Sequence, residues 1–409
     1  MARTLPPYPS GEASSPVAGR AGPRRGGAFA GVVAATLCCF VAVGAVLPVL
    51  PGFVRGPLGA GDLAVGVVIG AYTVTGLVGR PFAGRAADRR GRRRAMAAGA
   101  VAMALAGALY LVPAGVAGLL AARLVLGAGE ALVVTAGGAW VVDLAPPDRR
   151  GQAIGLLGLG IWGGVGLGPL AGQALLGLGG YPAVWAFAAI VPLIGVLALL
   201  TVPDPRGGAE PAALEPGGAG SGRLLPSEAL RPGVAIGLGS VGFATLAGFL
   251  VLHLQASGAG HGTAVFSLFA GTVVATRLLT GRLPDRLGAA RTAVAAGAAE
   301  ALGLVLIALA GGSWPLAAAG AMTMGLGFSV LYPALALIVV DRTDEREHGA
   351  ALGTYSAFFD AGVGIGAPMA GAVAAAAGYP TAFLVAAACA VLGALVSTYP
   401  RLRWTKRPA

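Results

Sequence analysis

The chain is dominated by long apolar runs that are separated by short polar connections. Each run is roughly 19 to 28 residues long, enough for an α-helix to cross the ~30 Å hydrocarbon core of a bilayer. The pattern predicts six helices, a polar linker and six more helices. The predicted helices cover residues 29–50, 64–84, 95–113, 117–142, 152–177, 182–202, 233–256, 262–283, 291–311, 315–340, 350–377 and 381–399.

Three segments lie outside these runs. Residues 1–27 are rich in Pro, Gly, Ser and Arg, and we expect a disordered tail there. The linker at 203–232 has no apolar face to bury and should be mobile, and a basic tail follows at 401–409. The predicted fold class is an all-α integral membrane protein of twelve transmembrane helices, with one bundle over residues 28–202 and a second over residues 233–400.

Composition supports this class, because 56% of the residues are hydrophobic and only 11% are charged, whereas a soluble protein usually has about a quarter charged residues. The net charge of +11 does not indicate nucleic acid, since the arginines lie in the short connections and not on one face. Cys38, Cys39 and Cys389 lie within apolar runs, and the three histidines lack ligand spacing. We therefore expect no disulfide, no metal site and no cofactor.

Basic residues set the orientation of a membrane protein. Twelve helices place both termini on one side. Every Lys and Arg residue except Arg55, Arg80, Arg123 and Arg277 falls in the tails, the linker or the connections on that side. Both termini and the linker are therefore predicted to be cytoplasmic. The first apolar run lacks a small-x-small cleavage signature, so it is predicted to be a spanning helix and not a signal peptide.

The two halves of the chain repeat one another. The pattern G-x-x-x-D-R-x-G follows the second apolar run of each half, 197 positions apart, and Arg80 before the first copy corresponds to Arg277 before the second. Gly127-x-Gly129 likewise aligns with Gly325-x-Gly327, 198 positions later. The first copy of the pattern comprises Gly84, Asp88, Arg89, Gly91, Arg92 and Arg93, and the second comprises Gly281, Asp285, Arg286 and Gly288.

The duplicated pattern resembles the loop between helices 2 and 3 in the major facilitator superfamily of secondary transporters. The resemblance covers residues 28–400 and implies two parallel six-helix repeats, a substrate site between them near the midplane, and alternating access. It also implies that the 84–93 motif latches the halves together on the cytoplasmic side when the protein faces outward. A charge cluster that only sets topology would need the arginines but not Asp88. The second copy has Ala289-Ala290 where the arginine pair would stand.

The fourth predicted helix, at residues 117–142, carries Arg123 and Glu130. They are seven residues apart and therefore lie on nearly the same face. Each would cost several kcal/mol in lipid, so we expect both to face the central cavity, although Arg123 could instead snorkel to the outer headgroups. Arginine followed by G-x-G-x-A resembles a family motif tied to proton handling. About 10 Å separates the two Cα atoms, so no permanent ion pair is expected, and Glu130 is the first proton-coupling candidate.

Helix 5 contains a glycine pattern in which Gly160, Gly164 and Gly168 share one face and allow another helix to pack closely. Pro169 follows, which removes a backbone hydrogen bond and bends the helix, and Gly172 ends the motif. The pattern resembles the helix-5 motif of drug:proton antiporters. The alternative is ordinary small-residue packing in a chain with 70 glycines.

Two further acids lie deep in predicted spans, and an acid inside the membrane is a candidate functional residue. Asp360 in helix 11 is expected to be a further proton site or a contact for a cationic substrate. Glu300 in helix 9 is equally deep. Helices 3, 6, 9 and 12 are peripheral in the family that the chain resembles, so a structural role is expected for Glu300.

These observations favour a secondary transporter in the cell membrane that exports a small apolar or cationic compound in exchange for protons. The partners expected are the substrate, protons and the bilayer, with no nucleic acid, and the protein is expected to be monomeric. The alternative is a proton-coupled symporter for a sugar, organic acid or other nutrient, although few polar groups are available to bind a sugar. A membrane enzyme or receptor would need a clustered nucleophile, metal ligands or an extramembrane domain. The sequence contains no G-x-x-x-x-G-K-[ST] loop, so we do not expect ATP to be the driving force.

Overall fold

The computed structural model describes residues 23–146, 149–202, 226–280, 287–344 and 347–398, and the regular structure of these residues is entirely α-helical. The first half contains α1 (Pro23–Val46), α2 (Leu50–Arg55), α3 (Asp62–Gly70), α4 (Tyr72–Arg90), α5 (Arg92–Leu109), α6 (Gly115–Leu144) and α7 (Arg150–Leu200). The second half contains α8 (Ser227–Ala256), α9 (Gly262–Thr280), α11 (Ala289–Ala308), α12 (Trp314–Val340), α13 (His348–Ala377) and α14 (Tyr379–Thr398).

The described residues confirm the predicted fold class. Ten helical segments are long and apolar enough to cross a membrane. One of these, α7, contains two spans, because Gly179 and Gly180 interrupt its helical geometry, and Gly180 has a φ of 66°. The remaining span is α5, whose first turn consists of three arginines. Together they make twelve spans in two halves of six.

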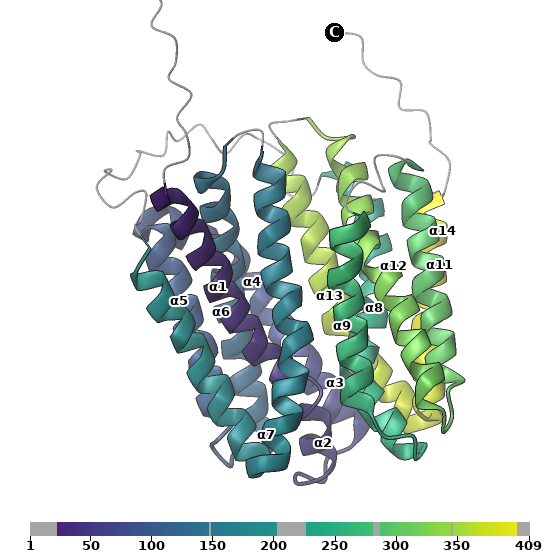
Figure 1. Ribbon diagram of the computed structural model, residues 1–409. Helices are drawn as coiled ribbons and strands as arrows, with labels where there is room; N and C mark the ends of the chain where they lie inside the picture. Colours follow the sequence, from purple (N-terminus) through teal and green to yellow (C-terminus); the bar gives the residue numbers. More distant parts are fainter. Residues whose placement is uncertain (1–22, 147–148, 203–225, 281–286, 345–346, 399–409) are drawn as a thin grey trace, which may run out of the picture.

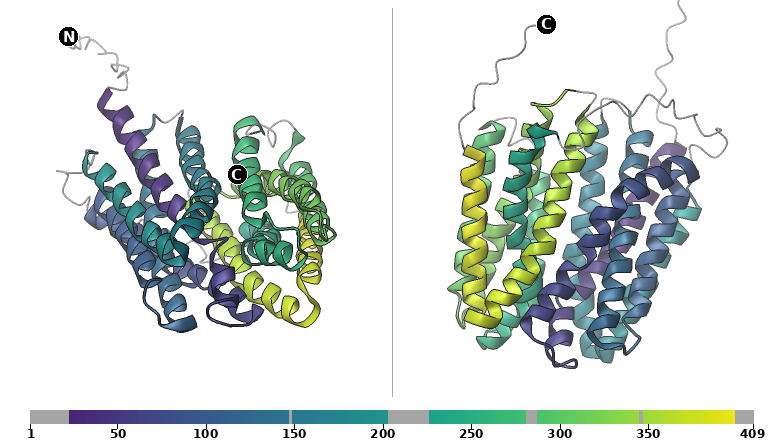
Figure 2. Two further views of the ribbon diagram at one scale, coloured as in Figure 1. Left: turned by 60° about the horizontal axis from the view of Figure 1, so that its bottom comes forward. Right: turned by 180° about the vertical axis from the view of Figure 1, so that it is seen from behind.

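The helices of the two halves stand side by side, with the first half on the left and the second on the right in Figure 1. α1 begins and α14 ends on the same side of the molecule, at the top of Figure 1, and we refer to this as the terminal side. The view from behind in Figure 2 shows the same two groups of helices.

Several predicted boundaries were wrong, and polar sequence that continues as helix explains each case. The charged stretch at 84–94 was expected to be a loop, but α4 continues to Arg90 and α5 begins at Arg92. Arginine is a good helix former, so charge ends the apolar span without ending the helix. Only Gly91, with a φ of 88°, separates the two helices. Similarly, the predicted tail included residues 23–27 and the predicted linker included residues 227–232, but both stretches are helical in the structure.

Glycines determine how closely the helices approach. A Cβ on Gly164 of α7 would lie 2.7 Å from the backbone of Phe40 in α1, so only glycine fits there. Between the halves, Gly70 at the end of α3 meets the backbone of Gly364 in α13, where a Cβ would lie 2.9 Å from the Gly364 oxygen. Close packing of small residues is how membrane helices associate, and here it joins helices both within and between the halves.

Candidate functional site

An ion pair connects the two halves in the middle of the molecule. Arg80 on α4 donates from Nε to Oδ2 of Asp360 on α13 at 2.8 Å, and from Nη2 to Oδ1 at 3.1 Å. The Asp360 side chain is only 10% exposed and that of Arg80 is 34% exposed. A bidentate pair of this kind is strong and directional, so Arg80 and Asp360 fix the first half against the second at this level.

Glu130 lies next to this pair. It belongs to α6 and lines a cavity of about 10 Å³ together with Arg80 and Asp360. Within the described part of the chain, the Glu130 carboxylate makes no hydrogen bond or ion pair. The remaining residues of the cavity wall are Tyr72, Thr73, Gly76, Ala131 and Val134.

Arg123 does not lie at this cavity, contrary to expectation. It is 1% exposed, and its guanidinium donates to the carbonyl oxygens of Val68 at 3.0 Å and Ile69 at 2.8 Å. These carbonyls end α3, where the break before α4 leaves them without helical partners. The guanidinium also lies over the ring of Tyr72, 4.7 Å from its centroid. Arg123 therefore stabilises the break in the second span. It lies neither at the cavity nor at the headgroups, the two positions expected from the sequence.

The 84–93 motif joins helices of the first half. Arg92 bonds Asp88 at 2.7 Å and Asp143 at the end of α6 at 3.2 Å, while Arg93 donates to the Val202 carbonyl at 3.4 Å. Gly84 lies inside α4 with open space around it, so of the two glycines only Gly91 is required by geometry. Of the second copy, Gly281, Asp285 and Arg286 lie outside the described residues, and Gly288 has a φ of 85°.

The glycine motif of the fifth predicted helix, which runs from Gly160 to Gly172, lies on α7 and packs against α1. A Cβ on Gly160 would lie 3.2 Å from the Val33 oxygen. Gly164, Gly168 and Gly172 approach the α1 backbone even more closely, and Pro169 lies within the same stretch of α7. The motif thus allows α1 and α7 to lie in backbone contact, as its spacing predicts.

Polar contacts also join the halves on the side away from the termini. Asp62, the first residue of α3, accepts a hydrogen bond from the Tyr379 hydroxyl of α14 at 3.0 Å and pairs with Arg55 at 3.3 Å. Thr263 of α9 donates to the Gln173 oxygen of α7 at 2.9 Å. The bonds of Arg92 and Arg93 on the terminal side stay within the first half. The structure is therefore tied across the halves on the side opposite the termini.

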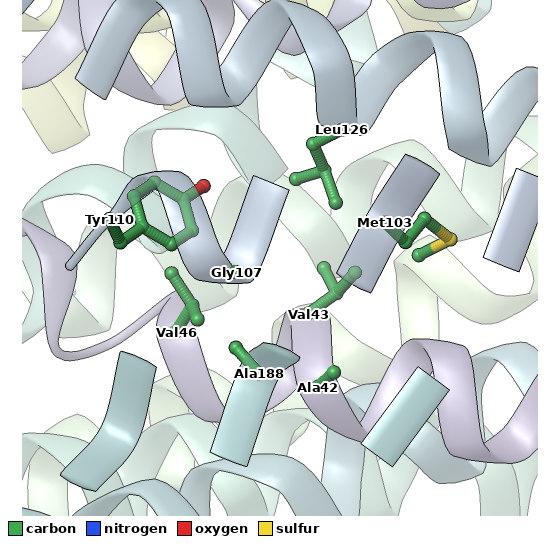
Figure 3. Close-up of a pocket in the computed structure, with 8 residues that line it drawn as sticks. All are labelled: Ala42, Val43, Val46, Met103, Gly107, Tyr110, Leu126 and Ala188. Carbon is green, nitrogen blue, oxygen red and sulfur yellow. The ribbon is translucent and has the colours of Figure 1, made fainter. Parts of the chain in front are cut away.

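A second small cavity lies inside the first half and is almost entirely apolar (Figure 3). Its volume is about 10 Å³, far below the roughly 300–1,000 Å³ of a typical ligand pocket. The cavity beside Glu130 is equally small. Neither cavity is large enough to hold a substrate in this arrangement. The apolar cavity is lined by Ala42, Val43, Val46, Met103, Gly107, Tyr110, Leu126 and Ala188.

Glu300 lies apart from the ion pair, within the packing of the second half. It is fully buried on α11, and neither of its carboxylate oxygens has a hydrogen-bond partner among the described residues. A Cβ added to Gly239 of α8 would lie 3.4 Å from one of these oxygens, and a Cβ on Gly242 would lie 2.6 Å from the other. Glu300 thus fills a space that these two glycines leave open.

Sequence reasoning identified Asp360 and Glu130 but did not identify Arg80 as part of the site. The available signal was an arginine inside an apolar span, repeated at Arg277. Its partner could not be inferred, because Asp360 lies 280 positions away along the chain.

Comparison with known proteins agrees with this architecture. The family model described as Major Facilitator Superfamily matches residues 32–255 and 233–409. An uncharacterized MFS-type transporter of Burkholderia mallei is 34% identical over 380 residues, 90% of each chain. Another from Pseudomonas aeruginosa is 33% identical over 386 residues, which cover 92% of this chain and 94% of that one.

Two solved structures share the fold. The human organic anion transporter MFSD10 matches with a TM-score of 0.70 and 21% identity over 92% of this chain and all of its own. The nucleoside transporter NupG, solved as a point mutant, matches with a TM-score of 0.74 and 14% identity over 90% of this chain and 98% of its own. The family model and the Burkholderia and Pseudomonas relatives establish that this chain belongs to the major facilitator superfamily of secondary transporters.

Proposed function

We propose that this transporter exports a small organic compound across the cell membrane in exchange for protons, with the terminal side in the cytoplasm. The observation that carries the proposal is Glu130, a carboxylate without a hydrogen-bond partner among the described residues, beside the Arg80–Asp360 pair that joins the halves. The glycine face of α7 against α1, typical of drug:proton antiporters in its spacing, supports export.

The arrangement suggests how a proton could control the contact between the halves. Arg80 and Glu130 belong to the first half and Asp360 to the second. With one proton on Glu130, the three groups sum to zero charge and can remain out of water. Loss of that proton leaves a net negative charge, which is costly in a closed apolar interior and favours the water-accessible state. It also provides Arg80 with a competing carboxylate in its own half.

The chemistry of the substrate is constrained by the same pair. A cationic compound was expected to contact Asp360, but the Asp360 carboxylate is bound by Arg80 through both oxygens. Because Arg80 occupies Asp360, a cationic substrate is no longer supported. A compound with a large apolar part remains supported. The solved relatives, at 21% and 14% identity, share only the fold, and by name they carry organic anions and nucleosides.

Flux into proteoliposomes tests the proposal. We would load vesicles with a pH-sensitive dye and follow 1-naphthalenesulfonate and naphthylmethyl-trimethylammonium, whose permanent charges prevent passive crossing. With a pH gradient of either sign imposed, exchange predicts that substrate moves against the direction of the protons. Movement of substrate together with protons would instead establish a symporter.

A further inference from the structure

Each half places one arginine at the contact with the other half, and the repeat relates the two positions. Arg80 on α4 and Arg277 on α9 are 197 positions apart. The neighbouring contacts correspond in the same way. Gly364 of α13 meets Thr73 of α4, and Gly166 of α7 meets Ala270 of α9. Because Thr73 and Ala270 are also 197 positions apart, the α4–α13 and α9–α7 contacts are equivalent.

The two arginines have different neighbours. With the offset of 198 that relates Gly166 to Gly364, Asp360 corresponds to Trp162 and Glu130 to Phe328. Arg80 therefore lies between two acids, whereas the guanidinium carbon of Arg277 lies 5.6 Å from the ring centroid of Trp162. Trp162 meets Phe328 edge to face, with their centroids 5.1 Å apart. Aromatic rings occupy the places that carboxylates hold in the other copy.

These rings belong to a larger aromatic cluster contributed by five helices, α7, α8, α9, α12 and α13. Phe243 stacks on Phe328 at 5.4 Å, and Tyr332 meets Phe359 at 6.0 Å between centroids. Phe243, Phe269 and Phe328 are buried in this arrangement, so these rings offer a surface to the flat apolar body of a ligand only when the halves separate. We define the aromatic cluster as Trp162, Phe243, Phe269, Phe328, Tyr332 and Phe359.

Arg277 carries a charge that the surrounding protein leaves without an acid. Its Nε is buried without a hydrogen-bond partner, and no carboxylate pairs with Arg277 in the part of the chain that the structure describes. A guanidinium stays protonated in proteins, and a cation without a counter-charge is costly inside a membrane. The Trp162 ring offsets only part of that cost.

We infer that Arg277 and the aromatic cluster bind the transported compound, and that this compound is an organic anion with an aromatic or otherwise apolar body. Its carboxylate, sulfonate or phosphate group accepts hydrogen bonds from the Arg277 guanidinium, as the Asp360 carboxylate does from Arg80. Its body packs against Trp162 and Phe328. The inference rests on the proposed transport function, but not on the direction of transport or on the proton.

Equilibrium binding to the purified full-length protein tests this site without any flux. We would measure calorimetrically three naphthalene compounds that differ in charge: 1-naphthalenesulfonate, 1-naphthylmethanol and naphthylmethyl-trimethylammonium. The sulfonate should bind saturably and about tenfold or more tightly than the other two, as a charge-assisted hydrogen bond predicts. Equal or tighter binding of the neutral or cationic compound, or no saturable binding of the sulfonate, would overturn the inference.

Two sets of variants locate the binding. Arg277→Gln should weaken sulfonate binding about tenfold or more, while Arg277→Lys should retain part of it. Trp162→Asp adds the carboxylate that this copy lacks, so it should weaken binding more than the neutral control Trp162→Asn. This comparison tests the site independently if Arg277→Gln does not fold. Unchanged affinity in Arg277→Gln, or equal affinities in the Trp162 variants, would contradict the anion site. If binding follows these expectations but flux shows no proton exchange, only the proposed exchange fails.

Discussion

Arg80 has two carboxylates near it and in this structure it binds the one in the opposite half. Asp360 accepts both of its hydrogen bonds, and Glu130 shares the cavity wall without a bond of its own among the described residues. A buried ion pair contributes little net stability, but removing one partner leaves an uncompensated charge. The pair is therefore a contact whose strength depends on what happens to either carboxylate.

Asp360→Asn should destabilise the protein, because it removes the carboxylate that accepts both hydrogen bonds of Arg80 across the halves. We expect a loss of about 1–3 kcal/mol, less than for a fully buried pair, since the Arg80 side chain is 34% exposed. The double variant Arg80→Gln, Asp360→Asn should recover much of this loss. Thermal unfolding in detergent measures both, and a single variant as stable as the wild type would refute a structural role for the pair.

At this scale the sequence predicted the depth of a residue better than its partner. The seven-residue spacing of Arg123 and Glu130 predicted no ion pair between them, and in the structure Arg123 donates to the Val68 and Ile69 carbonyls. It did not reveal that Arg123 binds the end of α3, because that break lies in another helix. Likewise, the depth of Asp360 was evident, but a partner in the other half depends on the packing of the helices.

At the scale of the helices, glycine determines which faces meet. The α7 glycines allow α1 to lie in backbone contact, and Gly66 allows α3 to approach Pro368 of α13. The apolar runs predicted all the spans, because each must cross the membrane. Their ends were predicted less well, because arginine-rich turns such as Arg92–Arg94 continue as helix.

Gly164→Ala should destabilise the first half. The new Cβ would lie 2.7 Å from the Phe40 backbone, which cannot move aside as a flexible side chain can, and overpacking of this kind typically costs about 1–3 kcal/mol. Gly163→Ala is the matched control, since its Cβ would make an ordinary contact at 3.6 Å with the Leu37 side chain. Thermal unfolding compares the two, and equal midpoints would count against the close-contact argument.

The 84–93 motif is predicted to act in the transport cycle and not in folding. Asp88 pairs with Arg92 one turn away and is 48% exposed, so Asp88→Asn should change stability by less than about 1 kcal/mol. Transport should nevertheless be lost while substrate binding remains. Asp285→Asn, in the second copy without the arginine pair, should have a smaller effect. Wild-type transport rates in Asp88→Asn would show that the motif only sets topology.

At the scale of the whole molecule, the structure is tied across its halves at the ion pair and on the side opposite the termini. Alternating access requires these contacts to open. If the terminal side is cytoplasmic, this arrangement is closed to the outside. We expect the 84–93 motif, which is bonded within the first half here, to contact the second half when the molecule faces outward.

The orientation can be tested through the linker. A protease site inserted near Gly217, which lies outside the described residues, should be cut in inside-out vesicles and not in intact cells. Transport should be retained after cleavage, since a continuous hydrophobic core with residues from both halves holds them together without the linker. Cutting from outside intact cells would reverse the predicted topology.

The central claim is that Glu130 exchanges the proton that drives transport. Glu130→Gln retains the shape of the side chain but has no proton to release. We therefore expect pH-driven efflux from proteoliposomes to vanish while exchange down a substrate gradient persists. Glu300→Gln is the matched control, because Glu300 is also a carboxylate within a span but is packed inside the second half, and it should retain driven efflux. Driven efflux at the wild-type rate in Glu130→Gln would contradict the account.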